Sequence, residues 1–252
     1  MSGGARLAAL TPDWGVPAVV RAAFTLRAGG VSTGPYESLN VAAHVGDAPE
    51  AVAENRRRIG AGLGLPGEPA WLEQVHGIDV IELGGPQAAP RSAHAADGVM
   101  TRRAGQVCVI QVADCLPVLL AARDGSAVAA AHAGWRGLAA GILEATVGRL
   151  GVDAGSLVAW LGPAIGVRHF EVGAEVRAAF LAHDPGADTA FSPNRRGRWQ
   201  CDLVALARRR LHALGVREIS GGEWCTYSDP ERFFSYRRER QCGRMAALVW
   251  LT

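Results

Sequence analysis

The sequence predicts an α+β protein of one domain, in which sheets and helices are stacked in layers. Its 252 residues are 49% hydrophobic and 20% charged, which is typical of a globular enzyme with a sizeable buried core. Strand-like apolar runs are mixed irregularly with helical segments, whereas a doubly wound parallel sheet requires strict alternation of the two. No linker or internal repeat divides the chain. We therefore expect residues 1–252 to form a single domain with mixed sheets.

The predicted strands are short apolar runs that end at Gly, Pro or polar residues. The first leads into a loop over residues 27–36, whose glycines allow a ligand to approach the backbone closely. Gly77 separates two of the others. In chain order, strands are expected over residues 19–26, 70–76, 78–83, 107–112, 117–121, 127–131, 157–161 and 246–251.

The predicted helices have apolar side chains at helical spacing and recognisable ends. Pro49 is typical of a first helical residue and Asp202 of an N-cap, while a Pro-Gly pair stops the third helix. Helices are expected over residues 49–63, 138–150, 175–183 and 202–214. Irregular loops are expected over residues 84–93, which are rich in Pro, and over residues 186–198, which contain a basic run.

Charge and cysteine content argue against several classes of protein. A net charge of +2 gives no reason to expect nucleic acid or an anionic membrane as a partner. All 26 basic residues are Arg, which excludes mechanisms that need a Lys Schiff base or a Lys general base. No apolar run is long enough to span a membrane, and the N-terminus lacks the pattern of a signal peptide. The five irregularly spaced cysteines indicate reduced thiols, so we expect a cytoplasmic protein.

Three chemically capable side chains follow apolar strands. Cys115 comes after the strand at 107–112, His132 after the strand at 127–131, and His76 ends the strand predicted at 70–76. Layered folds place functional groups at such strand ends. A thiolate and two imidazoles suit Zn²⁺ and leave a fourth position for water. His76, Cys115 and His132 are therefore candidate zinc ligands and candidate catalytic residues.

Two other interpretations use the same residues. Copper also accepts two His and one Cys, usually with an axial Met, but Met1, Met100 and Met245 lie outside such strand-end motifs, so zinc is preferred. Alternatively, Cys115 is a nucleophile and His132 is its base. A buried thiol and a satisfied histidine without catalytic roles are the structural alternative for this pair.

Several charged residues flank these positions. Asp114 is a candidate acid/base, or a group that orients a ligand. Arg136, in the turn GWRG between a strand and a helix, and Arg27, in the first glycine-rich loop, are candidate anion contacts. For each of the three, a structural role is the alternative. Charged residues at the surface are expected to be solvated, with Tyr236-Arg237 as the exception because it follows two apolar residues. His44 and the other remaining histidines are expected to be structural.

Seven longer stretches have the character of family motifs. They are LRAGGVSTGPYESLNVAAHVGD (26–47), WLEQVHG (71–77), ADGVMT (96–101), ADCLPVLL (113–120), AAHAGWRGLAAGILE (130–144), LGPAIGVRHFEVG (161–173) and CTYSDPERFFSYRRERQCGRMAALVWL (225–251). In this order, along nearly the whole chain, they resemble the laccase-like multicopper polyphenol oxidoreductase family. One departure is Cys242, where the resemblance leads us to expect Thr before Gly-Arg.

The resemblance implies a four-layer α/β/β/α sandwich over residues 1–252. Bacterial members are described as purine nucleoside phosphorylases with adenosine deaminase activity, or as peptidoglycan editing factors. That implies phosphorolysis of adenosine, inosine, guanosine and methylthioadenosine with phosphate, and deamination by zinc-activated water. His76, Cys115 and His132 would hold the zinc. By analogy, Arg27, Asn40 and Arg136 would lie around the nucleoside pocket.

Other functions stay open at this point. One is a hydrolase that edits misincorporated amino acids in peptidoglycan precursors, and another is a copper-dependent polyphenol oxidase. The chain has too few His and Cys motifs for a multicopper site. A non-enzymatic metal or redox-sensing module is a further alternative, although a structural zinc site normally has four protein ligands. We expect a monomer or a small homo-oligomer.

Overall fold

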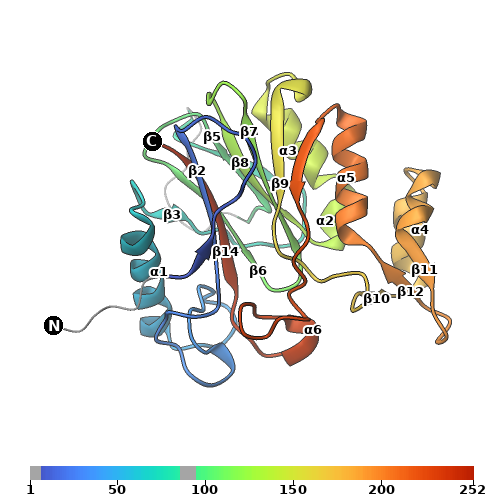
Figure 1. Ribbon diagram of the computed structural model, residues 1–252, viewed down its shortest axis with the longest axis horizontal. Helices are drawn as coiled ribbons and strands as arrows, with labels where there is room; N and C mark the ends of the chain where they lie inside the picture. The colour runs from blue at the N-terminus through green and yellow to red at the C-terminus, as the bar shows by residue number, and fades with distance from the viewer. Residues whose placement is uncertain (1–6, 86–94) are drawn as a thin grey trace.

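Two large β-sheets lie face to face in the computed structural model, which describes residues 7–85 and 95–252 (Figure 1). In the first sheet, β14 is central and pairs antiparallel with β2 and β6, while β3 joins β6 in parallel. Its strands, in spatial order, are β1 (Ala9–Leu10), β2 (Val20–Thr25), β14 (Met245–Leu251), β6 (Val107–Val112) and β3 (Pro69–Ala70).

The second sheet has six strands and is also mixed. β7 pairs antiparallel with both β8 and β9, whereas β13 and β4 are added in parallel at its two edges. Its strands, in spatial order, are β13 (Glu218–Gly221), β9 (Leu157–Leu161), β7 (Leu116–Ala122), β8 (Val128–Ala133), β5 (Gly98–Thr101) and β4 (Val80–Leu83).

Helices cover the outer faces of the two sheets. In Figure 1, α1 flanks the first sheet, while α3 and α5 flank the second. The helices are α1 (Pro49–Leu63), α2 (Trp135–Ala140), α3 (Ile142–Leu150), α4 (Ala174–Leu181), α5 (Leu203–Leu214) and α6 (Tyr236–Glu239), with short 3-10 helices at Gly34–Tyr36, Ala154–Ser156 and Pro185–Ala190. None of the helices within residues 7–85 and 95–252 has the length and apolar character that crossing a membrane requires.

Adjacent residues on the central strands point into different cores, because successive side chains of a strand face opposite sides. On β6, Val109 packs toward α1 and Ile110 packs between the sheets. On β7, Leu119 packs between the sheets and Leu120 packs toward α3 and α5. Three apolar cores therefore separate four layers, and the predicted α/β/β/α sandwich with mixed sheets is confirmed.

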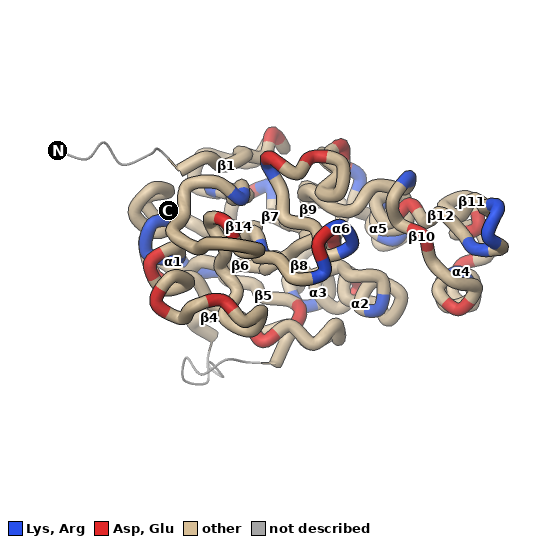
Figure 2. The backbone as a smooth tube through the Cα atoms, turned by 90° about the horizontal axis from the view of Figure 1, so that it is seen from below, with Lys and Arg blue, Asp and Glu red and all other residues tan. Residues whose placement is uncertain are grey.

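A smaller unit extends from the second helical layer (Figure 2). It contains α4 and a three-stranded antiparallel sheet formed by β10 (Glu171–Val172), β12 (Trp199–Cys201) and β11 (Phe191–Pro193). Phe180 and Phe191 join it to the core that lies beneath α3 and α5. Part of this unit falls in the predicted loop 186–198, so that prediction was wrong for β11.

Two other predicted elements differ from the structure. The strand expected over 70–76 is limited to β3, followed by one isolated bridge between Glu73 and Ala95. The helix expected over 138–150 is two helices, because Gly141 adopts φ 109° and ends the first. Residues 86–93 of the predicted Pro-rich loop, and His94, lie outside the described residues.

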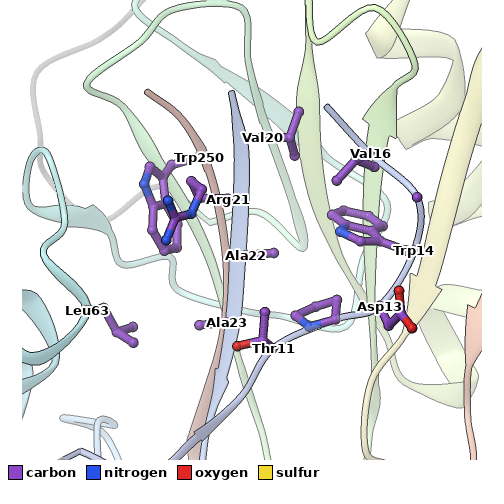
Figure 3. A pocket seen from close by; sticks show the side chains of 12 residues that line it. Thr11, Asp13, Trp14, Val16, Val20, Arg21, Ala22, Ala23, Leu63 and Trp250 are labelled. Carbon is purple, nitrogen blue, oxygen red and sulfur yellow. The ribbon is translucent and has the colours of Figure 1, made fainter. Parts of the chain in front are cut away.

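A groove of about 370 Å³ lies between β2 and residues 11–16 (Figure 3). Trp14, Leu63 and Trp250 are among its apolar lining residues, and Arg21 lies beside Trp250. Neither Cys nor His is among its lining residues, so it offers no soft metal ligands.

Candidate metal centre

The topology brings the three predicted ligands together at one end of the second sheet. His132 lies in β8, where it pairs with Pro117 of β7. Cys115 directly precedes β7, so it lies beside the end of β8. His76 reaches the same point from the loop that precedes β4. Thus the strand pairing of β7 with β8 positions two of the ligands, and a loop supplies the third.

The ligand atoms of His76, Cys115 and His132 all lie within 4.8 Å of one another. The Cys115 Sγ is 4.0 Å from the His76 Nε2, and the two imidazole rings are 4.8 Å apart at an angle of 66°. His76 is exposed, Cys115 is half-buried and His132 is buried. Within the residues described, this is the one cluster of three or more His, Cys, Asp or Glu with metal-binding geometry.

Asp97 contacts both histidines and was not singled out from the sequence. Its carboxylate is fully buried, and its Oδ1 lies 2.7 Å from the His132 Nδ1. The same carboxylate accepts hydrogen bonds from the backbone N–H groups of Val75, His76 and Gly77, at 3.1, 3.0 and 2.6 Å. Because Nδ1 of His132 is occupied in this way, its Nε2 is the nitrogen left for a metal.

The electrostatics favour the thiolate form of the cysteine. Burial by itself raises the pKa of the Cys115 thiol, but His132 and His76 outweigh burial and lower that pKa to about 6. Burial likewise lowers the pKa of His132, while Cys115 and Asp97 together raise it to about 9. In the absence of metal, both shifts favour a thiolate beside an imidazolium. The thiolate is also the form that binds metals.

Gly134 leaves room for two of the ligands. A Cβ at this position would lie 3.0 Å from the Cys115 Sγ and 3.1 Å from the His76 Cδ2. Real Cβ contacts are rarely so short, so a side chain here would displace a ligand. The first glycine of the GWRG turn is therefore a steric requirement of the ligand cluster.

A cavity of about 470 Å³ opens beside the ligand cluster. Three of its lining residues, Arg136, Arg237 and Arg244, form no ion pair with a carboxylate of the described chain. Arg237 and Arg244 use their Nη1 atoms to donate to backbone carbonyl oxygens. The cavity is thus cationic. Its remaining lining residues are His44, Gln74, His76, Gln111, Val112, Ala113, Asp114, Cys115, His132, Trp135, Ile165, Phe170 and Tyr236.

Asp114 and Arg136 both line this cavity, as do the three candidate ligands. Asp114 adopts a positive φ of 92°. Its carboxylate accepts hydrogen bonds from the Thr226 hydroxyl and the Arg237 N–H, both at 2.6 Å. Both oxygens are therefore engaged by Thr226 and Arg237 rather than by a candidate ligand, so the acid/base role and the ligand-orienting role of Asp114 stay predictions. Arg136 is exposed and stacks over Trp135 at 4.6 Å.

Arg27 and Asn40 are not among the described residues that line the cavity. The Arg27 guanidinium donates to the carbonyl oxygen of Pro230 at 2.8 Å and lies over the Phe234 ring. Asn40 is fully buried and accepts a hydrogen bond from the Arg244 N–H at 2.9 Å. Substrate contacts by these two residues stay predictions. Their observed bonds instead hold the loops around the cavity in place.

Sequence reasoning missed some cavity residues. His44 was expected to be structural, yet it lines the cavity, where burial and then Arg244 lower its pKa. Arg244 lies in the last of the seven family-like stretches, residues 225–251, and was not predicted to be functional. Its one available signal was its position between a glycine and the last apolar strand.

Comparisons with known proteins give the following matches. A family model described as multi-copper polyphenol oxidoreductase laccase matches residues 21–252. A purine nucleoside phosphorylase of Pseudomonas aeruginosa is 54% identical, over 96% of this chain and 98% of that protein. The purine nucleoside phosphorylase YfiH of Escherichia coli is 50% identical, with coverage of 96% and 98%.

Solved structures match over nearly the whole chain as well. Neisseria meningitidis protein NMB0706 aligns with a TM-score of 0.90 at 46% identity, covering 96% of this chain and 98% of that chain. YlmD from Geobacillus stearothermophilus aligns with a TM-score of 0.86 at 32% identity, and each chain is covered to 98%. Fold and sequence therefore point to the same group of proteins.

Proposed function

The chain belongs to the multi-copper polyphenol oxidoreductase laccase family, and we propose that it is a purine nucleoside phosphorylase with a metal ion at His76, Cys115 and His132. The names of relatives that share about half of its residues across nearly their whole length support this activity. We further propose that the metal is zinc, that the enzyme also deaminates adenosine, and that it works in the cytoplasm, where purine nucleosides and phosphate are available.

The cationic cavity beside the ligand cluster is the observation that carries the proposal. Phosphate is a dianion, and guanidinium groups bind it with charge-assisted, often bidentate hydrogen bonds. Arg136, Arg237 and Arg244 supply three such groups without competing carboxylate partners in the described residues. The volume of about 470 Å³ is that of a small-molecule site. Trp135 and Phe170 add aromatic surface suited to a purine.

In phosphorolysis, a phosphate oxygen forms a bond to C1′ of the ribose, and the bond from C1′ to N9 of the purine breaks. The electron pair of that bond leaves with the purine, which then takes up a proton, and ribose 1-phosphate is the other product. The arginines would hold phosphate in position to attack, so positioning and electrostatics are their contribution. Aromatic and aliphatic walls would exclude water and limit competing hydrolysis.

The donor set fits zinc better than copper. One thiolate and two imidazoles suit zinc, whereas a blue-copper site adds an axial Met. Met100 and Met245 are buried in the apolar cores and do not line the cavity. A multicopper site needs several ligand clusters, and only one is found in the described chain. When bound, zinc would supply an activated water for adenosine deamination, because three protein ligands leave its fourth position open.

The test is a set of parallel assays on protein purified without added metal, together with its metal content. We expect bound zinc, phosphate-dependent release of hypoxanthine from inosine, and conversion of adenosine to inosine. Absence of turnover of both nucleosides would refute the proposal. In that case, release of serine from a muramoyl–serine precursor would favour the editing hydrolase. Stoichiometric copper with oxidation of a phenol would instead favour the oxidase.

A further inference from the structure

We propose that Asp97 preorganises the metal site by positioning both histidine ligands with one buried carboxylate. The inference rests on the proposed metal site but concerns a residue that is not itself a ligand. Asp97 precedes β5 and is fully buried, between the end of β8 and the loop that carries His76. It is a positioning residue, because it acts on the metal through other side chains.

The first contact fixes the His132 imidazole. The distance of 2.7 Å between Asp97 Oδ1 and His132 Nδ1 is that of a strong hydrogen bond. The backbone adds a second tie, because the His132 N–H donates to the Asp97 carbonyl oxygen at 2.7 Å. A proton held on Nδ1 keeps the tautomer whose Nε2 can bind a metal, and it restricts rotation of the ring.

The second set of contacts fixes the loop of His76. His76 has φ 62°, a left-handed conformation that costs a residue with a Cβ about 1–2 kcal/mol. Few strand contacts hold this loop, since β3 ends at Ala70 and one isolated bridge follows at Glu73. Instead, three successive N–H groups, of Val75, His76 and Gly77, converge on the Asp97 carboxylate. Such a concave array of N–H groups is a favourable site for an anion.

The carboxylate has no oxygen left for the metal. Oδ1 contacts the His132 ring and the His76 N–H, and Oδ2 accepts from Val75 and Gly77. A role as fourth ligand would require these bonds to break. The Asp97 carboxylate holds both histidines in place. Its loss should therefore lower metal affinity by more than a mutation that only destabilises the fold.

The first experiment compares the Zn²⁺ affinity of the wild type and D97N by competition with a chromophoric chelator. Asn has nearly the shape of Asp, but its amide turns N–H donors toward the backbone N–H groups of the loop. We expect D97N to bind Zn²⁺ about 10–100-fold more weakly. The Co²⁺-substituted proteins should differ as well, with weaker d–d bands and a shifted thiolate charge-transfer band in D97N.

T101V is the matched control. Thr101 ends β5, is fully buried and forms hydrogen bonds with the Leu83 carbonyl oxygen and the Arg103 N–H, with no contact to a ligand. It should lower thermal stability and leave Zn²⁺ affinity within about twofold of the wild type. An equal loss of affinity in T101V and D97N would mean that Asp97 acts only on stability, and the inference would be wrong.

A measurement on the wild type does not depend on whether D97N folds. Long-range ¹H–¹⁵N spectra of the zinc-loaded protein should show a proton on His132 Nδ1 and the metal on Nε2. Metal on Nδ1, or unchanged zinc affinity in folded D97N, would overturn the inference. A wild type that binds no metal would refute the proposed metal centre itself, which is a different result from either of these.

Discussion

The substitution G134A tests the site with one added methyl group. Gly134 has φ −61°, so alanine fits its backbone without strain, and any effect comes from the space that the Cβ occupies. That Cβ would lie 3.0 Å from the Cys115 Sγ and 3.1 Å from the His76 Cδ2, whereas ordinary contact begins at 3.4 Å. Two ligands must therefore move by a few tenths of an ångström.

Such a shift is large for a metal site, where ligand distances hold to within about 0.2 Å. We expect Zn²⁺ affinity to fall about tenfold or more, which corresponds to about 1.4 kcal/mol of binding free energy. The assay is chelator competition, with thermal unfolding of the metal-free protein measured in parallel. We expect zinc affinity to fall while the thermal stability of the metal-free protein changes little.

G148A is the matched control for G134A. Gly148 lies in α3, is exposed and has open space around its Cβ position. Alanine there should stabilise the protein by about 0.5–1 kcal/mol and leave metal affinity unchanged. If G134A retained full zinc affinity, a Cβ at position 134 would not disturb the ligands, and the steric reasoning would be wrong.

Three further predictions concern pH, phosphate and stability. A proton on His132, with a pKa of about 9, competes with the metal, while Cys115, with a pKa of about 6, is already a thiolate. Zinc affinity should thus rise about tenfold per pH unit between about pH 7, where Cys115 is largely ionised, and about pH 9, and then level off; a flat titration by chelator competition would contradict this. R136M should raise the KM for phosphate about tenfold in steady-state assays, whereas R27M should mainly lower the free energy of unfolding. The reverse pattern would mean that Arg27 binds phosphate and Arg136 is structural. D202A removes the side-chain acceptor that caps α5. It should lower the free energy of unfolding measured with urea by about 1 kcal/mol without changing activity, and an unchanged free energy would mean that the cap does not stabilise the fold.

Local sequence signals predicted an element correctly where its apolar spacing and its end signals all lie within one segment. The predicted bounds of α1 and β6 match the structure, and Asp202 caps α5 as expected. The helix expected over 138–150 was wrong because its apolar spacing continues across Gly141, whose left-handed backbone interrupts the helix. The strand expected over 70–76 was wrong because its N–H groups bond to a side chain rather than to a neighbouring strand.

The candidate ligands could be found from sequence because each stands at a visible break in an apolar run. Asp97 and Arg244 gave no comparable signal. Asp97 acquires its role from contacts with His132 and with the His76 loop, which are 35 and 21 residues away in the chain. Arg244 becomes a cavity residue because β14 pairs with β6 and so places it beside the strand end that leads to Cys115.

The sequence by itself determined the class of fold, the four layers through its resemblance to a family, and the residue types that offer a metal one thiolate and two imidazoles. Only the tertiary structure decided that their ligand atoms converge within 4.8 Å, that Asp97 joins the two histidines, and that Arg136 faces the cavity while Arg27 does not line it. The physical reason is how far apart in the sequence the interacting residues lie. Periodicity and capping act between neighbours in the chain, whereas the site depends on strand pairing and buried hydrogen bonds between segments far apart in sequence.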